Sequence, residues 1–291
     1  VSSGTLTTWA VLLESERNYK LAREKFALAC AVDSKNFAAP HAWGMMEQKR
    51  GNYDKARKLL MKSLEITPRS TTYNALANLE NRVGDRKQAR KYYEKSIEKQ
   101  SGRNANASSS GYTQFAMFET SCGNFDKAEE LFERGWALLE SSKSSSFSSE
   151  SVHLLTNWAD LLSKRMLTLQ NQTNSEVKDV VNGRNGSSKS SNSDSNDSIR
   201  KVFEERVSEK FRLAAKLNPS RAETYTSWSL SERAFTSKFD ASDSNKRSVT
   251  SREYDIITEG IRRCPGESKL YLAEAMYLRR ENRTEEALEK L

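Results

Sequence analysis

Residues 40–68, PHAWGMMEQKRGNYDKARKLLMKSLEITP, decide the fold because they predict two short helices packed against each other. Gly44 on the first helix leaves room for Leu60 on the second, as close helix packing requires. Gly51 can take the left-handed conformation that ends the first helix, and Pro68 closes the second. The stretch therefore reads as one helical hairpin.

The same pattern recurs along the chain with a period of 33 or 34 residues, and 39 where a Ser/Asn-rich segment intervenes. Four repeat positions keep the same kind of residue in each repeat, so the recurrence is not explained by chance. They are bulky residues (Trp9, Trp43, Leu76, Phe115), small residues directly after them (Ala10, Gly44, Ala77, Ala116), alanines (Ala22, Ala56, Ala89, Ala128) and large apolar residues (Phe26, Leu60, Tyr93, Phe132).

A single hairpin cannot bury this apolar stripe, so neighbouring hairpins must stack. The predicted fold class is all-α, an α-α superhelical solenoid of about seven hairpins whose last member is truncated. Trp158 and Trp228 restart first helices in the later units, and Leu291 matches Leu60, so the sequence is expected to stop inside a helix. Only 12 Gly and 4 Pro agree with helices joined by short links.

The predicted organisation follows from where Ser/Asn-rich segments interrupt the repeats. Residues 1–140 hold repeats 1–4, and residues 151–291 hold repeats 5–7 of the same solenoid. Between them, 141–150 is a Ser-rich link. Within the second part, 170–198 is predicted to be a disordered insert because it has almost no apolar content, and 240–248 is a shorter polar insert.

The turn and acidic columns add local predictions. Gly51, Gly84 and Gly123 are expected in the left-handed conformation, and the next residues, Asn52, Asp85 and Asn124, are expected to cap the second helices. One glutamate recurs per repeat, which predicts an ion pair or hydrogen bond within the repeat rather than a catalytic carboxylate pair. These are Glu47, Glu80 and Glu119.

Composition argues against enzymatic chemistry. The chain has 2 His, no Walker loop and no G-x-G-x-x-G motif, and its 3 Cys form no C-x-x-C pair, so no catalytic residue, metal site or cofactor is predicted. No apolar run reaches the roughly 18 residues of a membrane span. The formal net charge of +8 makes an anionic partner plausible.

The columns resemble the tetratricopeptide repeat, and more closely its half-a-TPR (HAT) relative. The resemblance is carried by Trp43 with Glu47, by Phe115 with Glu119, and by the phrases GNYDKARKLL and GNFDKAEELF. Within HAT proteins the chain looks most like the group that processes and protects chloroplast messenger RNAs. The resemblance implies RNA processing, other RNA-processing proteins as partners, and a plastid location or alternatively the nucleus. The three cysteines, which indicate no disulfide framework, favour an intracellular, reducing compartment. Leu76 in the Trp column and Glu253 in the alanine column depart from the pattern.

Positions just off the packing stripe of the first helices predict a binding groove. Two residues before the bulky column, short hydrogen-bonding side chains recur: Thr7, His41, Asn74, Thr113, Thr156 and Thr226. Beyond that column comes a basic row: Lys49, Arg82, Lys164, Arg233 and Arg280. We expect such a groove to bind single-stranded RNA without catalysis, with base edges meeting the polar residues and phosphates meeting the basic ones. The alternative is a protein-interaction scaffold, because the same groove can hold a peptide or a partner helix.

Overall fold

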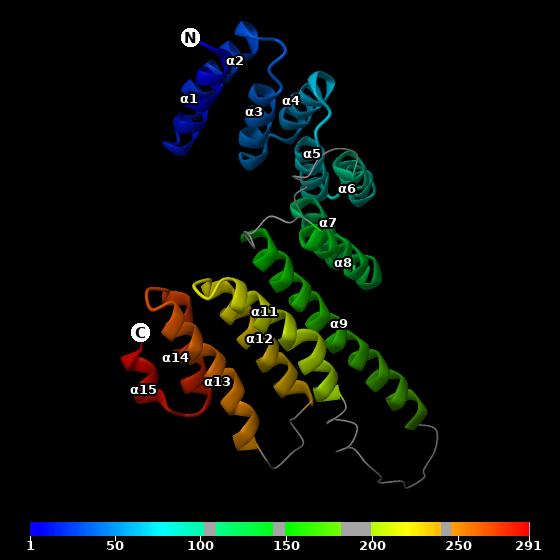
Figure 1. Ribbon diagram of the computed structural model, residues 1–291, viewed down its shortest axis with the longest axis vertical. Helices are drawn as coiled ribbons and strands as arrows, with labels where there is room; N and C mark the ends of the chain where they lie inside the picture. The colour runs from blue at the N-terminus through cyan, green and yellow to red at the C-terminus, as the bar shows by residue number, and fades with distance from the viewer. Residues whose placement is uncertain (102–108, 142–148, 182–198, 240–245, 291) are drawn as a thin grey trace. The chain divides into compact units, whose positions relative to one another are not determined.

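The computed structural model describes residues 1–101, 109–141, 149–181, 199–239 and 246–290 (Figure 1). Every regular element in these ranges is helical, and residues 199–203 are helical up to a π-helical turn, η1. The elements are α1 (Ser3–Ser15), α2 (Tyr19–Val32), α3 (Ala38–Lys49), α4 (Tyr53–Ile66), α5 (Ser70–Val83), α6 (Arg86–Ser101), α7 (Ser110–Ser121), α8 (Phe125–Ser141), α9 (Ser149–Val181), η1 (Glu204–Ser208), α11 (Glu209–Leu217), α12 (Ala222–Phe239), α13 (Lys246–Arg263), α14 (Ser268–Arg280) and α15 (Thr284–Glu289).

Consecutive helices form hairpins, so the predicted all-α repeat fold is confirmed in the described residues. The second helix of the fifth hairpin, residues 199–217, includes η1 and α11. The last hairpin is the truncated one, because α15 has only 6 residues. None of the described helices is long and apolar enough to cross a membrane.

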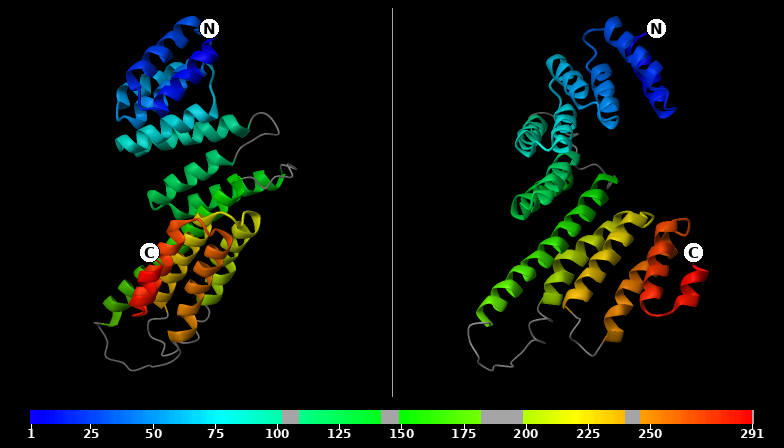
Figure 2. Two further views of the ribbon diagram at one scale, coloured as in Figure 1. Left: turned by 90° about the vertical axis from the view of Figure 1, so that its left-hand side faces the viewer. Right: turned by 180° about the vertical axis from the view of Figure 1, so that it is seen from behind.

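The chain divides into two units, residues 1–115 and 116–291, which we call unit 1 and unit 2. In unit 1 the first helices α1, α3 and α5 contact one another in order, while α2, α4 and α6 pack as their partners (Figure 2). In unit 2 the same holds for α9, α12 and α14. We call these two sets the first-helix layers. The predicted grouping into residues 1–140 and 151–291 stays a prediction.

The small residue Gly44 and the large residue Leu60 pack against each other as predicted. A β-carbon built on Gly44 would lie 2.8 Å from Leu60 Cγ, so only glycine allows this approach. At the turns, Gly51, Gly84 and Gly123 have φ angles of 79°, 99° and 82°, in the left-handed region predicted for them.

Aromatic pairs join successive hairpins. The large apolar residue of one hairpin stacks on the bulky residue of the next, with ring planes within 10° of parallel, in Phe26–Trp43, Tyr93–Phe115, Phe132–Trp158 and Phe211–Trp228. Trp9 is the exception to the predicted buried column, since its side chain is 44% exposed. No hairpin lies before α1 in the described chain, so Trp9 has Lys25 on one face, 4.1 Å from the ring centroid, and no aromatic partner.

The recurring glutamate joins hairpins as well as stabilising its own. Glu47 is fully buried and accepts hydrogen bonds from Trp43 and Asn52 of its own hairpin, at 3.0 and 2.7 Å. Arg23 on α2 of the preceding hairpin adds a bidentate pair at 2.8 and 2.9 Å. Arg57 binds Glu80 in the same way. The predicted intra-repeat interaction is confirmed for Glu47, and the arginine extends it across the interface.

These donors control the charge of Glu47. Burial alone would raise its pKa, but the hydrogen bonds from Arg23, Asn52, Lys55 and Trp43 together hold the pKa well below its usual range. The carboxylate therefore stays ionised inside the hairpin interface.

The predicted caps are confirmed only in part. Asp85 Oδ1 accepts a hydrogen bond from the backbone N–H of Gln88 at 2.9 Å, as a capping residue should. Asn52 makes no such bond, because its amide turns back to Glu47 instead. Asn124 donates to Glu119 at 2.6 Å in the same manner. The buried carboxylate competes with the helix end for these amides.

The Ser/Asn-rich segments need one correction. The predicted disordered insert 170–198 begins too early, since α9 continues to Val181. Residues 170–181 contain neither Gly nor Pro, so nothing in their backbone stops the helix. Residues 182–198 lie outside the described residues. So do 142–148 of the predicted link 141–150 and 240–245 of the predicted insert 240–248.

Candidate functional site: the exposed face of the first helices

Most of the hydrogen-bonding side chains that were predicted to line the groove already have partners inside the fold. Each threonine hydroxyl donates to a carbonyl of its own helix three or four residues earlier, as isolated helical threonines commonly do. The pairs are Thr7 to Ser3 (2.8 Å), Thr113 to Ser109 (3.2 Å), Thr156 to Val152 (2.8 Å) and Thr226 to Glu223 (3.0 Å).

Three of the side chains predicted to line the groove are also buried. Asn74, Thr113 and Thr156 are 9%, 2% and 8% exposed, so they do not line an open groove as expected. For Thr156 the cause is the neighbouring hairpin, because Thr156 Oγ1 lies 3.4 Å from Thr224 Oγ1 on α12. The expectation of freely exposed base-reading groups at these three positions is wrong.

His41 is half-buried and also has a partner inside the fold. Its Nδ1 lies 3.0 Å from Thr72 Oγ1 on α5, and burial lowers the pKa of the half-buried ring, so the neutral form is favoured. Asn74 differs from the rest, because its buried Oδ1 has no hydrogen-bond partner among the described residues.

The basic row is exposed except at the half-buried Arg233, but only some of its members are free of ion pairs. Lys49 pairs with Glu14 at 2.8 Å, and Arg280 pairs with Glu253 at 2.5 Å. In the described ranges, neither Arg82 nor Lys164 nor Arg233 has an ion-pair partner within 4.0 Å. Lys49 and Arg82 belong to unit 1, and the other three belong to unit 2.

A second column, which the sequence prediction missed, is both apolar and exposed. It stands two residues after the bulky column, on the open side of the first helices. The side chains that are more than 36% exposed there are Val11 (44%), Met117 (44%), Leu230 (59%) and Met276 (54%). Met45 is half-buried at the same position. The signal was available in the sequence, since this column reads Val, Met, Asn, Met, Asp, Leu and Met from the first to the last hairpin.

Two residues of this column, Asn78 and Asp160, are polar. Asn78 accepts a hydrogen bond from Tyr93 at 2.6 Å and donates to Gln114 at 3.1 Å. Asp160 on α9 is half-buried, and this burial raises its pKa to about 6, with Lys164 acting in the opposite direction. The open face is therefore apolar in most hairpins, with one weakly acidic group in unit 2.

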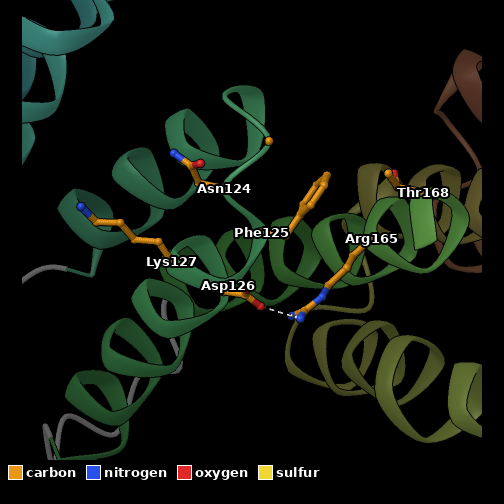
Figure 3. Close-up of a pocket in the computed structure, with 7 residues that line it drawn as sticks. Asn124, Phe125, Asp126, Lys127, Arg165 and Thr168 are labelled. Atoms are coloured by element: carbon orange, nitrogen blue, oxygen red, sulfur yellow. Dashed lines mark hydrogen bonds and ion pairs between the residues drawn. The ribbon is translucent and has the colours of Figure 1, made fainter. Parts of the chain in front are cut away.

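A notch recurs where the turn of one hairpin meets the end of the next first helix. In unit 2 it has a volume of about 470 Å³ (Figure 3). Arg165 reaches from α9 to Asp126 at the start of α8, at 2.5 Å, and also pairs with Glu129 at 2.5 Å. The other lining residues are Gly123, Asn124, Phe125, Lys127 and Thr168. The arginine of this notch is therefore neutralised.

The equivalent notch in unit 1 differs in that its arginine is not paired with a carboxylate of the described residues. Its volume is about 620 Å³, and it lies between the α1–α2 turn and the end of α3. Here Arg50 lies over the Tyr19 ring at 4.1 Å and has no carboxylate partner among the described residues. The other lining residues are Val11, Glu14, Ser15, Arg17, Met46 and Lys49.

Comparisons with known proteins agree with the fold. A family model of the tetratricopeptide repeat matches residues 35–101. No curated protein matches the sequence. The chain is similar in structure to yeast Tom70, with 16% identity and a TM-score of 0.62 over 95% of this chain and 46% of that one.

Two bacterial structures are similar over most of both chains. A tetratricopeptide repeat protein from Parabacteroides merdae has 12% identity and a TM-score of 0.57 over 99% of this chain and 90% of that one. Pseudomonas aeruginosa pilF has 14% identity and a TM-score of 0.52 over 89% and 90%. This protein is thus a tetratricopeptide-repeat-like helical repeat protein, and its closer resemblance to the HAT group stays a prediction.

Proposed function

We propose that this repeat protein is a non-catalytic scaffold that holds a segment of another protein against its first-helix layers. The observation that carries the proposal is the column of exposed Val, Met and Leu side chains. Apolar side chains at one repeat position, left in water in both units, favour a partner that buries them, at about 25 cal/mol per Å². Methionine suits this role because its flexible thioether adapts to different partners.

The same face offers less to RNA. Binding of a single strand relies on stacking of bases on open aromatic rings and on free cations for phosphates. The tryptophans Trp43, Trp158 and Trp228 instead pack between hairpins, and Lys49 and Arg280 already hold carboxylates. RNA binding stays a prediction from the polar and basic positions and the net charge, and RNA-processing partners and a plastid or nuclear location stay predictions from the sequence resemblance.

A peptide-display selection on the full chain tests the proposal. A random library of twelve-residue peptides is selected, and the affinity of the recovered peptides is measured for wild type and for Val11→Ser, Leu230→Ser and Met276→Ser. We expect at least one of the three to weaken each peptide about tenfold, because an anchoring apolar contact is lost. The matched control is Leu28→Ser, since Leu28 is 47% exposed but lies on a second helix.

Two outcomes would overturn the proposal. One is selected peptides whose binding ignores all three first-helix variants or depends equally on Leu28. The other is salt-sensitive binding of an unstructured RNA that is lost in the triple variant Lys49→Glu, Arg82→Glu and Lys164→Glu, together with no peptide binding. That second result would favour the RNA function.

A further inference from the structure

We propose that the notch of unit 1 binds a phosphoryl group carried by a protein segment. The inference rests on the proposed function for the nature of the ligand, while the anion site itself rests on the notch. Three cations, Arg17, Lys49 and Arg50, line the notch with a single carboxylate, Glu14. This leaves a balance of two positive charges, which matches the −1.5 to −2 charge of a phosphorylated side chain at neutral pH.

Arg50 is oriented by a neighbouring ring and is not paired with a carboxylate of the described residues. Its guanidinium lies over the Tyr19 ring, which orients the side chain by a cation–π contact, and its N–H groups have no partner among the described residues. Planar guanidinium groups bind phosphate oxygens in pairs, so an oriented and unpaired arginine is suited to this ligand. The volume of about 620 Å³ and the apolar walls of Val11 and Met46 leave room for the body of the modified side chain.

The backbone of Arg17 supports the same reading. Its φ of 61° is in the left-handed region, at the turn position where other hairpins carry Gly51, Gly84 and Gly123. A side chain in this conformation costs about 1 kcal/mol relative to glycine. The first hairpin thus places a cation at the notch at a cost in stability, whereas the last hairpin has the uncharged Asn282 at the same turn position with the same φ of 61°.

The unit 2 notch serves as an internal comparison. It has the same position between hairpins, and Arg165 is its arginine. Asp126 and Glu129 neutralise Arg165, so an anion would have to displace them. The unit 1 notch should therefore bind a phosphoryl group and the unit 2 notch should not.

The test compares three pools of labelled degenerate ten-residue peptides with a central phosphoserine, glutamate or serine. Binding to the full chain is measured by fluorescence anisotropy. We expect the phosphoserine pool to bind at least tenfold tighter than the serine pool, with the glutamate pool in between. The preference should decline below about pH 6, where the phosphate loses its second charge.

Variants locate the site. The double variant Arg17→Gln, Arg50→Gln should abolish the phosphoserine preference, whereas Lys20→Gln, on an exposed lysine at the start of α2, should keep it. In unit 2, freeing Arg165 by Asp126→Asn with Glu129→Gln should increase phosphoserine binding.

Equal affinities for the phosphoserine and serine pools would overturn the inference, as would a preference that survives the double variant. Loss of the inference is distinguishable from loss of the proposed function. If the serine pool still depends on Leu230 and Met276 while no phosphoserine preference exists, the scaffold stands and the notch is not a phosphoryl site.

Discussion

At the scale of single residues, the tightest requirement is at Gly44. An added methyl group would lie 2.8 Å from Leu60 Cγ and 3.3 Å from the carbonyl oxygen of Ala56, and Leu60 is fully buried. We expect Gly44→Ala to lower the free energy of unfolding by about 1–3 kcal/mol, the usual cost of overpacking. This loss should outweigh the roughly 1 kcal/mol by which alanine favours a helix. Urea unfolding followed by circular dichroism measures it.

Two further variants check the cause. Gly266→Ala should change the free energy of unfolding by less than about 0.5 kcal/mol, because the space around that glycine is open. In a Leu60→Ala background, Gly44→Ala should cost much less, since the methyl group then has a cavity to enter. An undiminished cost in that background would contradict the assigned contact.

The contact of Gly44 with Leu60 was predictable because both sides of it recur with the repeat period. The exposure of Trp9 was not, because the periodic column says which face a residue occupies but not whether a neighbour stands against that face. Trp43 and Trp158 have an aromatic neighbour from the preceding hairpin, and Trp9 has none in the described chain. Sequence periodicity defines the stripe, while burial depends on what stacks upon it.

At the scale of helices and hairpins, Glu47 makes the interface between α2 and α3 sensitive to acid. Its pKa is lowered in the folded chain from an ordinary value of 4.5. The stabilising contribution is therefore complete above about pH 4.5 and is lost as the pH falls below that value. We expect Glu47→Gln to cost about 2–3 kcal/mol at pH 7, because Arg23 and Lys55 lose their buried partner but can turn toward water.

The check is to measure unfolding of wild type and Glu47→Gln from pH 7 to pH 3. The difference between them should shrink toward pH 3, because Glu47 of the unfolded wild type gains a proton there while the folded chain still holds it as a carboxylate. The control is Glu130→Gln, which removes an exposed pair with Arg134 and should change stability by less than about 1 kcal/mol at any pH. A difference that stays constant with pH would show that the charge of Glu47 does not matter.

Asn52 and Asp85 provide a matched pair at two helix starts. Asparagine and aspartate cap helices about equally well, so Asp85→Asn should be nearly neutral at α6. Asn52→Asp should instead destabilise the chain by about 1–2 kcal/mol, because it replaces a donor to Glu47 with a second carboxylate. Thermal unfolding of both variants at pH 7 separates the two roles. Equal behaviour would mean that Asn52 acts as a cap after all.

These two residues also mark where local sequence rules end. The Gly-Asn and Gly-Asp pairs look alike as turn signals, and both predicted a cap. The difference arises because Asn52 has Glu47 within reach across the turn, and an amide can donate to a carboxylate whereas an aspartate cannot. Tertiary hydrogen bonds then decide between two local options.

At the scale of the whole molecule, the candidate site was harder to predict than the fold. The repeat period correctly placed Thr156 on a first helix, but its burial depends on how closely the next hairpin approaches. The period carries no information about that approach. The exposed column with Val11 and Leu230 was visible in the same alignment, yet only the structure identifies it as the open face.

A stack of hairpins also predicts how far along the chain a destabilising substitution acts. Because successive hairpins contact one another within each unit, a local loss of stability should stay local. In Gly44→Ala, we expect faster amide hydrogen exchange in α3 and α4 and in the adjoining α2 and α5, with α13 and α14 unchanged. Exchange followed by mass spectrometry on the full chain measures this, with Gly266→Ala as the control. A uniform loss of protection in every helix would contradict nearest-neighbour coupling, since it would mean that the hairpins unfold as a single cooperative unit.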